Sequence, residues 1–255
     1  MKFIFAGDRD ISVWVLQAML DFNLKPSALI ITESSKATHS QKLIDLSGLP
    51  PEYILEGKAF ESPDGIALMR NINPDFIFGI HFPYFIRQEV LEIPRKGFLN
   101  LHPSFLPFNR GWHTPSWAIL EKTPIGATLH FMAQEIDNGD VIHQKRLEIL
   151  PNDTANSLYI RLKKLELQVF IEALPSILSG DFKRKSLNLN QGTIHKRKDL
   201  FKSTVQKIEL NESYCASELI DKIRALTTNQ WVEAAYFEKN GEKFRVRIEI
   251  IKDEF

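Results

Sequence analysis

The sequence contains very little cysteine: Cys215 is the one cysteine among 255 residues. No intramolecular disulfide can form, and a zinc site built from several cysteines is excluded. Long apolar runs are also missing, since none approaches the roughly 18 residues that a membrane-spanning helix needs. The apolar stretch after Met1 is too short for a secretory signal. These absences predict a cytoplasmic protein that has no membrane partner.

The chain lacks an excess of charge of either sign, because 32 Lys and Arg residues balance 32 Asp and Glu residues. Proteins that mainly bind nucleic-acid phosphates carry a basic surplus, so we expect no nucleic acid partner. Hydrophobic residues make up 44% and charged residues 25%, which is enough apolar material for a full core. The length fits one large domain, or a domain of about 150–200 residues with a small appendage.

Glycine is scarce where a dinucleotide-binding protein would need it. The turn after the first predicted strand, residues 7–12, has one glycine, so the dinucleotide fingerprint is missing. Continuous apolar segments alternate with helical patterns, which is typical of a parallel α/β sheet covered by helices on both faces. These predicted strands are residues 2–6, 28–32, 74–80 and 98–102.

The second half of the chain predicts two more strands, at 127–132 and 141–144, and a long helix at 154–178. The apolar positions expected to pack that helix on the sheet are Leu158, Leu162, Leu165, Val169 and Ile171. Beyond about residue 185 the sequence becomes rich in Lys, Asn and Thr, and Asn240-Gly241 between two alternating runs predicts a β-hairpin. We therefore expect a larger α/β domain over 1–185 and a small helix-and-hairpin module over 186–255.

The densest polar cluster lies at the end of a predicted strand. Asn100 and His102 are two residues apart, so their side chains point to the same face. Parallel sheets bind ligands beyond the carboxyl ends of their strands. Asn can donate an N–H to a developing oxyanion and His can donate or move a proton, a combination that suits acyl transfer. A loop cap before Pro103 is the structural alternative.

A second polar loop covers residues 135–140, and its composition is good turn chemistry. In a functional interpretation Asp137 faces His102, holds its tautomer and stabilises the imidazolium. A metal site made of His102, Asp137, Asp140 and His143 is a third interpretation. These residues lack the short paired spacing of metal ligands, so we expect no metal.

A third segment, residues 106–117, combines arginine, tryptophan and histidine around Gly111. Arg110, Trp112 and His113 could hold a phosphate and stack on a base. A buried aromatic loop with a surface arginine is the alternative. Arg9, on the first turn, could reach the same crevice or could be a solvated charge.

Three segments together resemble the folate-dependent formyltransferase family: residues 97–111, 126–131 and 136–144. That family includes glycinamide ribonucleotide formyltransferase, methionyl-tRNA formyltransferase and the sugar N-formyltransferases. The Asn-x-His-Pro-Ser-x-Leu-Pro element followed by Asp-x-Gly-Asp is highly specific. The resemblance covers about residues 1–185, and the tail also resembles the family's carboxyl-terminal module through 223–226, 235–237 and the hairpin at Gly241.

The resemblance implies a Rossmann-like fold for the amino-terminal domain, with Asn100, His102 and Asp137 as catalytic residues. It further implies 10-formyltetrahydrofolate as formyl donor, a primary amine as acceptor and no metal. Two loops should form the folate pocket, largely through their backbone. The residues expected there are Ile80, His81, Phe82, Tyr84, Gln134, Ile136 and Asp140.

Residues 109–118 look most similar to sugar N-formyltransferases that act on dTDP-linked 4-amino-4,6-dideoxyhexoses. In that case Arg9, Arg110, Trp112 and His113 contact the nucleotide-linked sugar, the tail helps to form a homodimer, and the product serves surface polysaccharide such as O-antigen. A methionyl-tRNA or other amine formyltransferase is an alternative. A formyltetrahydrofolate hydrolase is less expected, since its regulatory domain would precede the strand that begins at Lys2. A folate- or nucleotide-binding module without activity is the non-enzymatic alternative.

Overall fold

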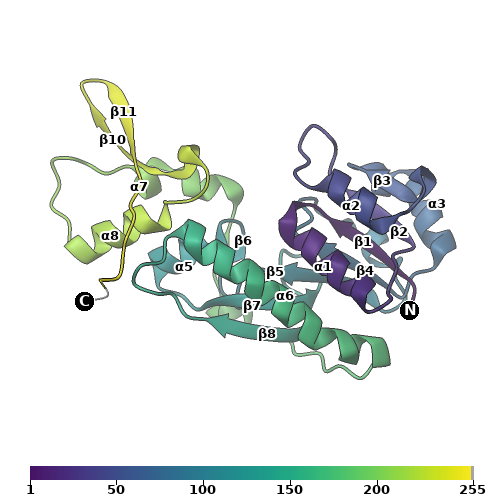
Figure 1. Ribbon diagram of the computed structural model, residues 1–255. Helices are drawn as coiled ribbons and strands as arrows, with labels where there is room; N and C mark the ends of the chain where they lie inside the picture. Colours follow the sequence, from purple (N-terminus) through teal and green to yellow (C-terminus); the bar gives the residue numbers. More distant parts are fainter. Residues whose placement is uncertain (254–255) are drawn as a thin grey trace. The chain divides into compact units, whose positions relative to one another are not determined.

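The computed structural model describes residues 1–253 (Figure 1). The strands are β1 (Phe3–Gly7), β2 (Ala28–Ile31), β3 (Ile54–Glu56), β4 (Phe76–Ile80), β5 (Gly97–His102), β6 (Arg110–Gly111), β7 (Ile125–Phe131), β8 (Val141–Leu147), β9 (Ile194–His195), β10 (Ala235–Lys239) and β11 (Glu242–Val246). The α-helices are α1 (Arg9–Asp21), α2 (Ser40–Ser47), α3 (Pro63–Ile72), α4 (Gln88–Leu91), α5 (Thr114–Glu121), α6 (Ala155–Ser179), α7 (Ser203–Gln206) and α8 (Ala216–Ala225).

A seven-stranded sheet with the order β3-β2-β1-β4-β5-β7-β8 forms the centre of the fold. The pairs from β3 to β5 are parallel, whereas β7 runs antiparallel to β5. The predicted α/β fold with a mostly parallel sheet is confirmed. The reversal at β7 matters for the site, because it places residues from two distant segments directly opposite one another.

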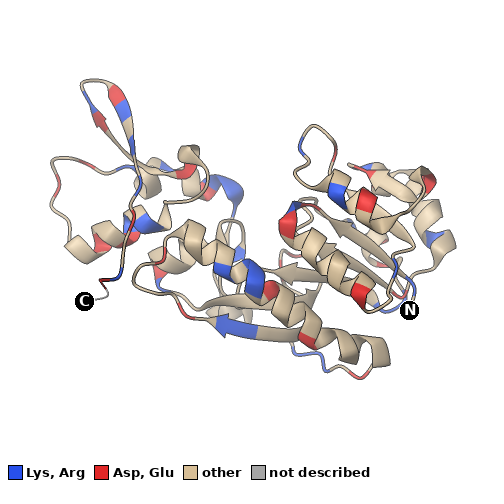
Figure 2. Cartoon of the chain, viewed as in Figure 1, with Lys and Arg blue, Asp and Glu red and all other residues tan. Residues whose placement is uncertain are grey.

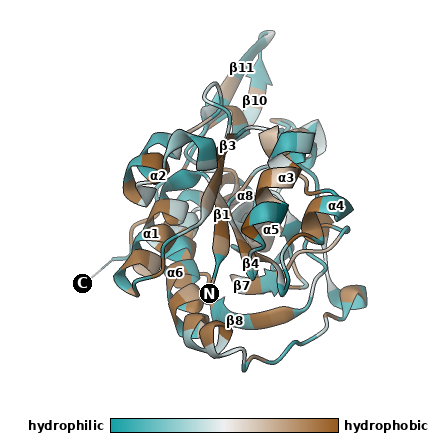
Figure 3. Ribbon diagram, turned by 90° about the vertical axis from the view of Figure 1, so that its right-hand side faces the viewer, coloured by the Kyte–Doolittle hydropathy of each residue, from teal (hydrophilic) through white to brown (hydrophobic). Residues whose placement is uncertain are grey.

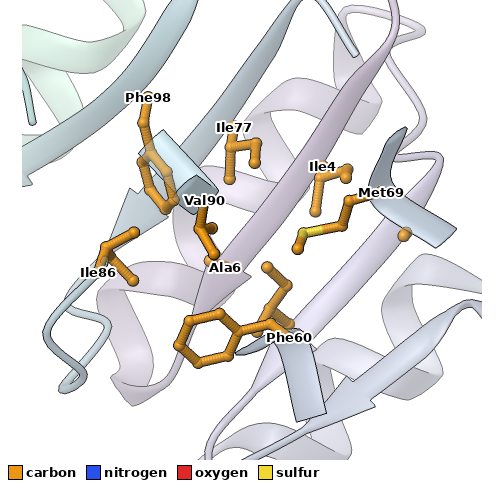
Figure 4. Close-up of a cluster of buried hydrophobic side chains, with 10 residues drawn as sticks. Ile4, Ala6, Phe60, Met69, Ile77, Ile86, Val90 and Phe98 are labelled. Carbon is orange, nitrogen blue, oxygen red and sulfur yellow. The ribbon is translucent and has the colours of Figure 1, made fainter. Parts of the chain in front are cut away.

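Both faces of the sheet are covered, as the alternation along β4 shows. Neighbouring residues of a strand point to opposite faces, and Ile77 and Phe78 are both fully buried. Phe78 meets Phe170 of α6, with ring centroids 5.7 Å apart. Ile77 belongs to a cluster on the other face that includes Met69 of α3 and Val90 of α4 (Figure 4). Helices therefore pack against both faces.

The long predicted helix is α6, and Gly180 follows its end in a left-handed conformation. Of its expected core positions, Leu158, Leu162 and Val169 are fully buried. The expectation for Ile171 is wrong, because its side chain is 36% exposed. The neighbouring Phe170 takes the buried position instead. Figure 3 shows this mixture of hydrophobic and hydrophilic positions along the helices.

The chain divides into two compact units, which are not consecutive in sequence. Unit 1 comprises Met1–His102, Thr128–Gln144 and Glu166–Leu187, and unit 2 comprises Pro103–Ala127, Lys145–Leu165 and the chain from Asn188. Acidic and basic residues are interspersed in each (Figure 2). The predicted boundary between residues 185 and 186 stays a prediction.

The predicted hairpin near the carboxyl end is present. Strands β10 and β11 pair antiparallel, with Lys239 opposite Glu242. Asn240 and Gly241 have φ angles of 53° and 80°, the left-handed values that a two-residue hairpin turn requires. Among residues 1–253, no helix combines the length and apolar character needed to span a membrane.

Candidate active site

Three polar side chains meet on one face of the sheet in unit 1. Asn100 lies opposite His130 in the antiparallel pair β5–β7, and His102 lies opposite Thr128. Residues two apart in a strand share a face, so Asn100, His102 and His130 point to the same side. Asn100 Nδ2 lies 3.2 Å from His130 Nε2. His130 was not predicted as a site residue, although it lies within a segment, residues 126–131, that carries the family resemblance.

Asp137 completes the cluster from the loop between β7 and β8. Its Oδ2 lies 3.3 Å from His102 Nε2, and its Oδ1 lies 3.5 Å from Asn100 Nδ2 and 3.7 Å from His130 Nε2. The predicted meeting of Asp137 and His102 is therefore found in the structure. Asn100, His102 and His130 thus all lie close to the carboxylate of Asp137.

The loop that carries Asp137 returns closely over β7. The backbone N–H of Phe131 donates to the carbonyl of Asp140 at 2.9 Å. A Cβ atom built on Gly139 would lie 1.8 Å from the carbonyl oxygen of Phe131. Any side chain at position 139 would therefore force the loop away from the sheet. Asp137 itself has a φ of 49°, a left-handed conformation that is uncommon outside glycine and clusters at functional sites.

His130 is completely buried, and its environment fixes its protonation. Burial lowers the pKa of His130 from 6.5 to about 4, although Asp137 acts in the opposite direction. The ring is therefore neutral at physiological pH. Its Nδ1 lies 2.7 Å from the carbonyl oxygen of Phe131, which can accept but not donate. Nδ1 must carry the hydrogen, so Nε2 accepts a hydrogen bond from Asn100 Nδ2.

This assignment orients the Asn100 amide toward the cluster. One Nδ2 hydrogen is given to His130, and the other faces Asp137 at the long distance of 3.5 Å. Nε2 of His102 is buried and makes no aligned hydrogen bond within residues 1–253, although Asp137 Oδ2 lies at ion-pair distance. Asn100 Nδ2 and His102 Nε2 thus lie near the carboxylate of Asp137, but neither forms a short hydrogen bond with it. Such looseness is common in active sites before substrate binds.

The predicted folate loop after β4 is firmly anchored. Ile80 is fully buried at the end of β4, and its carbonyl accepts a hydrogen bond from Ser12 Oγ at 2.5 Å. The rings of Phe82 and Tyr84 both pack against Phe60, with centroids 5.6 and 6.0 Å away. Both side chains thus pack against the core, and the role of this loop's backbone in folate binding stays a prediction.

His81, in the same loop, has a φ of 50° and pairs with the buried Glu166 of α6. In the other predicted folate loop, Gln134 and Ile136 are exposed. Asp140 accepts a hydrogen bond from Ser186 Oγ at 2.9 Å. The structure therefore places these residues on two separate loops of unit 1. One follows β4, whose Ile80 lies opposite Leu101 of β5, and the other carries Asp137.

Arg9 follows β1 in unit 1 with an exposed side chain and a φ of 76°. The residue before it, Asp8, accepts hydrogen bonds from the backbone N–H groups of Thr38 and His39 at 3.0 and 2.8 Å. Burial alone would raise the pKa of Asp8, but these bonds outweigh it and the pKa lies below its ordinary value. Asp8 thus fixes the turn from which Arg9 projects.

The remaining predicted substrate residues, Arg110, Trp112 and His113, lie together in unit 2. Strand β6 pairs with β9, and the Trp112 N–H donates to the His195 carbonyl at 3.0 Å. Trp112 is 41% exposed, and the guanidinium of Arg197 lies 5.5 Å from the centre of its ring. Arg197 was not predicted, because only the pairing of β6 with β9 brings it beside Trp112. A shared crevice with Arg9 stays a prediction.

His113 is held from several sides. Its Nδ1 lies 3.7 Å from Glu233, and its ring packs against Phe201 with centroids 5.9 Å apart. Burial lowers the pKa of His113 although Glu233 acts to raise it. The Nε atom of Arg110 is buried and makes no hydrogen bond to any residue that the structure describes.

The residues of the alternative metal site have other partners. His143 pairs with Glu172 at 2.8 Å, and Asp140 binds Ser186. Among the described residues, no group of three or more His, Cys, Asp or Glu side chains could hold a metal ion.

The comparisons with known proteins agree with the motif-based interpretation. Residues 3–174 match the family described as formyl transferase, and residues 200–252 match the N-formyltransferase dimerization C-terminal domain. The chain belongs to the formyl transferase family. The first match lies within residues 1–185, and the second contains the segments 223–226 and 235–237 that carry the resemblance of the tail.

Curated members of the family include two kinds of relative. A dTDP-4-amino-4,6-dideoxyglucose formyltransferase from Mycobacterium tuberculosis is 29% identical over 150 residues, which are 59% of this chain and 63% of that enzyme. A methionyl-tRNA formyltransferase from Clostridium beijerinckii is 28% identical over 264 residues, with 99% of this chain and 82% of that enzyme covered. The chain thus spans less than two thirds of the mycobacterial enzyme.

Solved structures of family members share the fold over nearly the whole chain. A 4-N formyltransferase from Francisella tularensis has a TM-score of 0.82 at 25% identity and covers 99% of both chains. A sugar 3N-formyl transferase, determined in the presence of dTDP and 5-N-formyl-THF, has a TM-score of 0.72 at 24% identity, over 95% of this chain and 84% of that one.

Proposed function

We propose that this protein transfers a formyl group from 10-formyltetrahydrofolate to the primary amine of a dTDP-linked 4-amino-4,6-dideoxy sugar. The observation that carries the proposal is the convergence of Asn100, His102 and Asp137 on one face of the sheet. The product would serve surface polysaccharide synthesis. In this role Arg9, Arg110, Trp112 and His113 bind the nucleotide-linked sugar, and the loops after β4 and β7 bind the folate.

The cluster supplies the parts that acyl transfer to an amine requires. As the amine adds, negative charge develops on the formyl oxygen, and hydrogen-bond donors preorganised toward that oxygen stabilise it. His102 and Asn100 are those donors. Asn100 can turn one Nδ2 hydrogen to the formyl oxygen because its contact with Asp137 is long, at 3.5 Å. His130 keeps the other hydrogen and so holds the amide in orientation.

Asp137 is the group that accepts the proton released by the amine. The new bond joins the amine nitrogen to the formyl carbon, and the bond from that carbon to N10 of the folate breaks. The amine loses one proton and N10 gains one, so the reaction needs a group that accepts and returns a proton. Asp137, at 3.3 Å from His102, stabilises the charged imidazolium and receives the amine proton directly or through water.

The relatives support a sugar acceptor. The mycobacterial relative is named for a dTDP-4-amino-4,6-dideoxy sugar, and the solved sugar 3N-formyl transferase was studied with dTDP and a formylated folate. In unit 2, the exposed indole of Trp112 beside Arg197 offers a stacking surface next to a cation. Such a surface suits a nucleoside diphosphate.

Formylation of methionyl-tRNA is the second candidate, because the Clostridium relative aligns over 99% of this chain. The charge balance favours the sugar. A tRNA-binding protein gains affinity from a basic surplus, and this chain has 32 basic and 32 acidic residues.

One assay separates the candidates. The protein is incubated with 10-formyltetrahydrofolate alone, with a panel of dTDP- and UDP-linked amino sugars, or with methionyl-tRNA, and the release of tetrahydrofolate is followed. We expect release that depends on a dTDP-linked amino sugar. Release with methionyl-tRNA alone would favour the second candidate, and release without any acceptor would indicate a hydrolase. No release under any condition would contradict transfer altogether.

A further inference from the structure

Glu166 is a buried carboxylate outside the catalytic cluster. It lies on α6 with no exposed side-chain surface, and its Oε1 is 2.7 Å from His81 Nε2. Its Oε2 is buried and has no hydrogen-bond partner within residues 1–253. Removing a carboxylate from water is costly unless the group is paired, so its pairing with His81 accounts for its place in the core.

His81 stands at a bend that its own side chain does not favour. It is the first residue after β4, and its φ of 50° is left-handed. The Cβ atom makes this conformation unfavourable for residues other than glycine, and it persists where the surroundings impose it. The contact with Glu166 pulls the imidazole toward α6 and thereby imposes the bend.

The residues on either side of the bend are anchored separately. Before it, Ile80 is held by Ser12 Oγ. After it, the Tyr84 hydroxyl accepts a hydrogen bond from the backbone N–H of Glu33 at 3.3 Å, and Phe82 packs on Phe60. The direction of the chain between these anchors depends on the backbone at His81, which Glu166 holds.

We propose that Glu166 is a positioning residue for the formyl donor: by holding His81 it sets the course of residues 80–86, whose backbone receives the folate. This inference rests on the proposed function. Buried ion pairs contribute little net stability compared with apolar residues of similar size. Packing alone would be served as well by an apolar side chain, whereas a carboxylate 2.7 Å from the imidazole imposes one direction on the His81 side chain.

The test compares three variants. Glu166→Met keeps the volume but removes the acceptor, and Glu166→Gln keeps an oxygen that a neutral His81 can donate to. Glu172→Gln is the matched control, because Glu172 also lies on α6 and pairs with a histidine, His143, at 2.8 Å, but is 39% exposed. Each variant is first checked by thermal unfolding. If Glu166→Met does not fold, the double variant Glu166→Met with His81→Leu is used in its place, because it removes both partners of this contact together.

The first measurement needs no substrate. Amide hydrogen exchange is followed in the free protein for residues 81–86, apart from Pro83, which has no amide hydrogen. Glu166→Met should raise exchange in this segment by about tenfold, which corresponds to the loss of roughly 1.4 kcal/mol of local stability. Glu166→Gln should raise it less, and Glu172→Gln should leave it unchanged. Unchanged exchange in Glu166→Met would overturn the inference.

The second measurement uses 5-formyltetrahydrofolate, a stable isomer of the donor, as the binding probe in calorimetry. Glu166→Met should weaken binding by about tenfold, with rescue by Glu166→Gln. In the transfer assay the KM for the donor should rise, while the KM for the sugar stays constant. A purely structural role would lower the active fraction without moving either KM, and that result would also overturn the inference.

The two proposals fail in different ways. If the wild-type protein neither binds the probe nor transfers formyl groups, the proposed function is wrong and the role toward the donor falls with it. The exchange data would then still show whether Glu166 holds the bend. If the wild type binds the probe and Glu166→Met binds it equally well, the function stands and the positioning role alone is wrong.

Discussion

At the scale of single residues, the burial of His130 has a measurable cost in acid. The unfolded chain protonates this ring as the pH falls below its ordinary pKa of 6.5, whereas the folded protein keeps it neutral down to a pKa of about 4. Between these values the unfolded state binds more protons. The free energy of unfolding therefore falls as the pH decreases through this window.

We expect His130 to account for a loss of up to about 3 kcal/mol between pH 7 and pH 4, at about 1.4 kcal/mol for each pH unit. Urea unfolding of the wild type and of His130→Gln, measured from pH 7 to pH 4, checks this. The variant should be less stable at pH 7 but should lose less stability on acidification. Parallel pH profiles for the two proteins would contradict the burial argument.

The catalytic cluster makes a second prediction at this scale. Asn100→Ala, His102→Ala and Asp137→Ala should each lower kcat by about 10²–10³-fold or more, since each removes a donor or the proton acceptor. Steady-state kinetics measures the effect, and circular dichroism checks that each variant is folded. Near-wild-type turnover in the His102 variant would exclude the proposed mechanism.

At the scale of secondary-structure elements, the alternation of side chains along a strand made part of the site predictable. Asn100 and His102 are two apart in an apolar run, so their common face follows from the sequence. His130 could not be found in this way, because its place opposite Asn100 depends on the register of β5 with β7, which is a long-range pairing. Alternation along a strand assigns each residue to a face of the sheet, but it does not say which residue of a distant strand lies opposite it.

Other elements were missed for local reasons. Strand β3 has three residues, none of them fully buried, so it shows no apolar run. Helix α3 begins with signals that are readable in retrospect: Ser62 caps it by accepting from the Gly65 N–H, and Pro63 is its first residue. Ile171 was misassigned because one step along α6 turns a side chain by about 100°, and the buried face there belongs to Phe170.

The pair Phe170 and Ile171 provides an element-scale prediction. Phe170→Ala should cost about 3–5 kcal/mol, because it removes a buried ring that packs on Phe78. Ile171→Ala, at a position 36% exposed, should change stability by about 0.5 kcal/mol or less. Urea unfolding of both variants measures the difference. Equal losses of stability in the two variants would contradict the orientation of α6, in which Phe170 and not Ile171 faces the sheet.

At the scale of the whole molecule, residues 200–252 match a dimerization domain, and this part of unit 2 carries exposed apolar side chains. Trp231 and Val232 are 58% and 55% exposed, and Phe244 on the hairpin is 42% exposed. Scattered apolar residues are normal on a surface, so the proposal of association rests on the match to a dimerization domain and not on exposure alone. We propose that the chain forms a homodimer through this module.

Light scattering coupled to gel filtration tests the dimer. We expect a mass of about twice the 29.4 kDa of the single chain. Introducing Trp231→Glu together with Val232→Glu should shift the mass toward that of the monomer, since two charges would be buried without partners. A monomeric wild type at micromolar concentration would exclude this role for the module.

The antiparallel pairing of β5 and β7 has an evolutionary consequence. The chain leaves unit 1 after His102 and re-enters at Thr128, and these two residues are register partners. The segment between them starts and ends at neighbouring positions of the sheet. Its length can therefore change while Asn100 stays opposite His130 and His102 stays opposite Thr128. If the proposed function is right, insertions, deletions and exchanges between His102 and β7 would alter the predicted sugar-binding segment without shifting Asn100 from its place opposite His130.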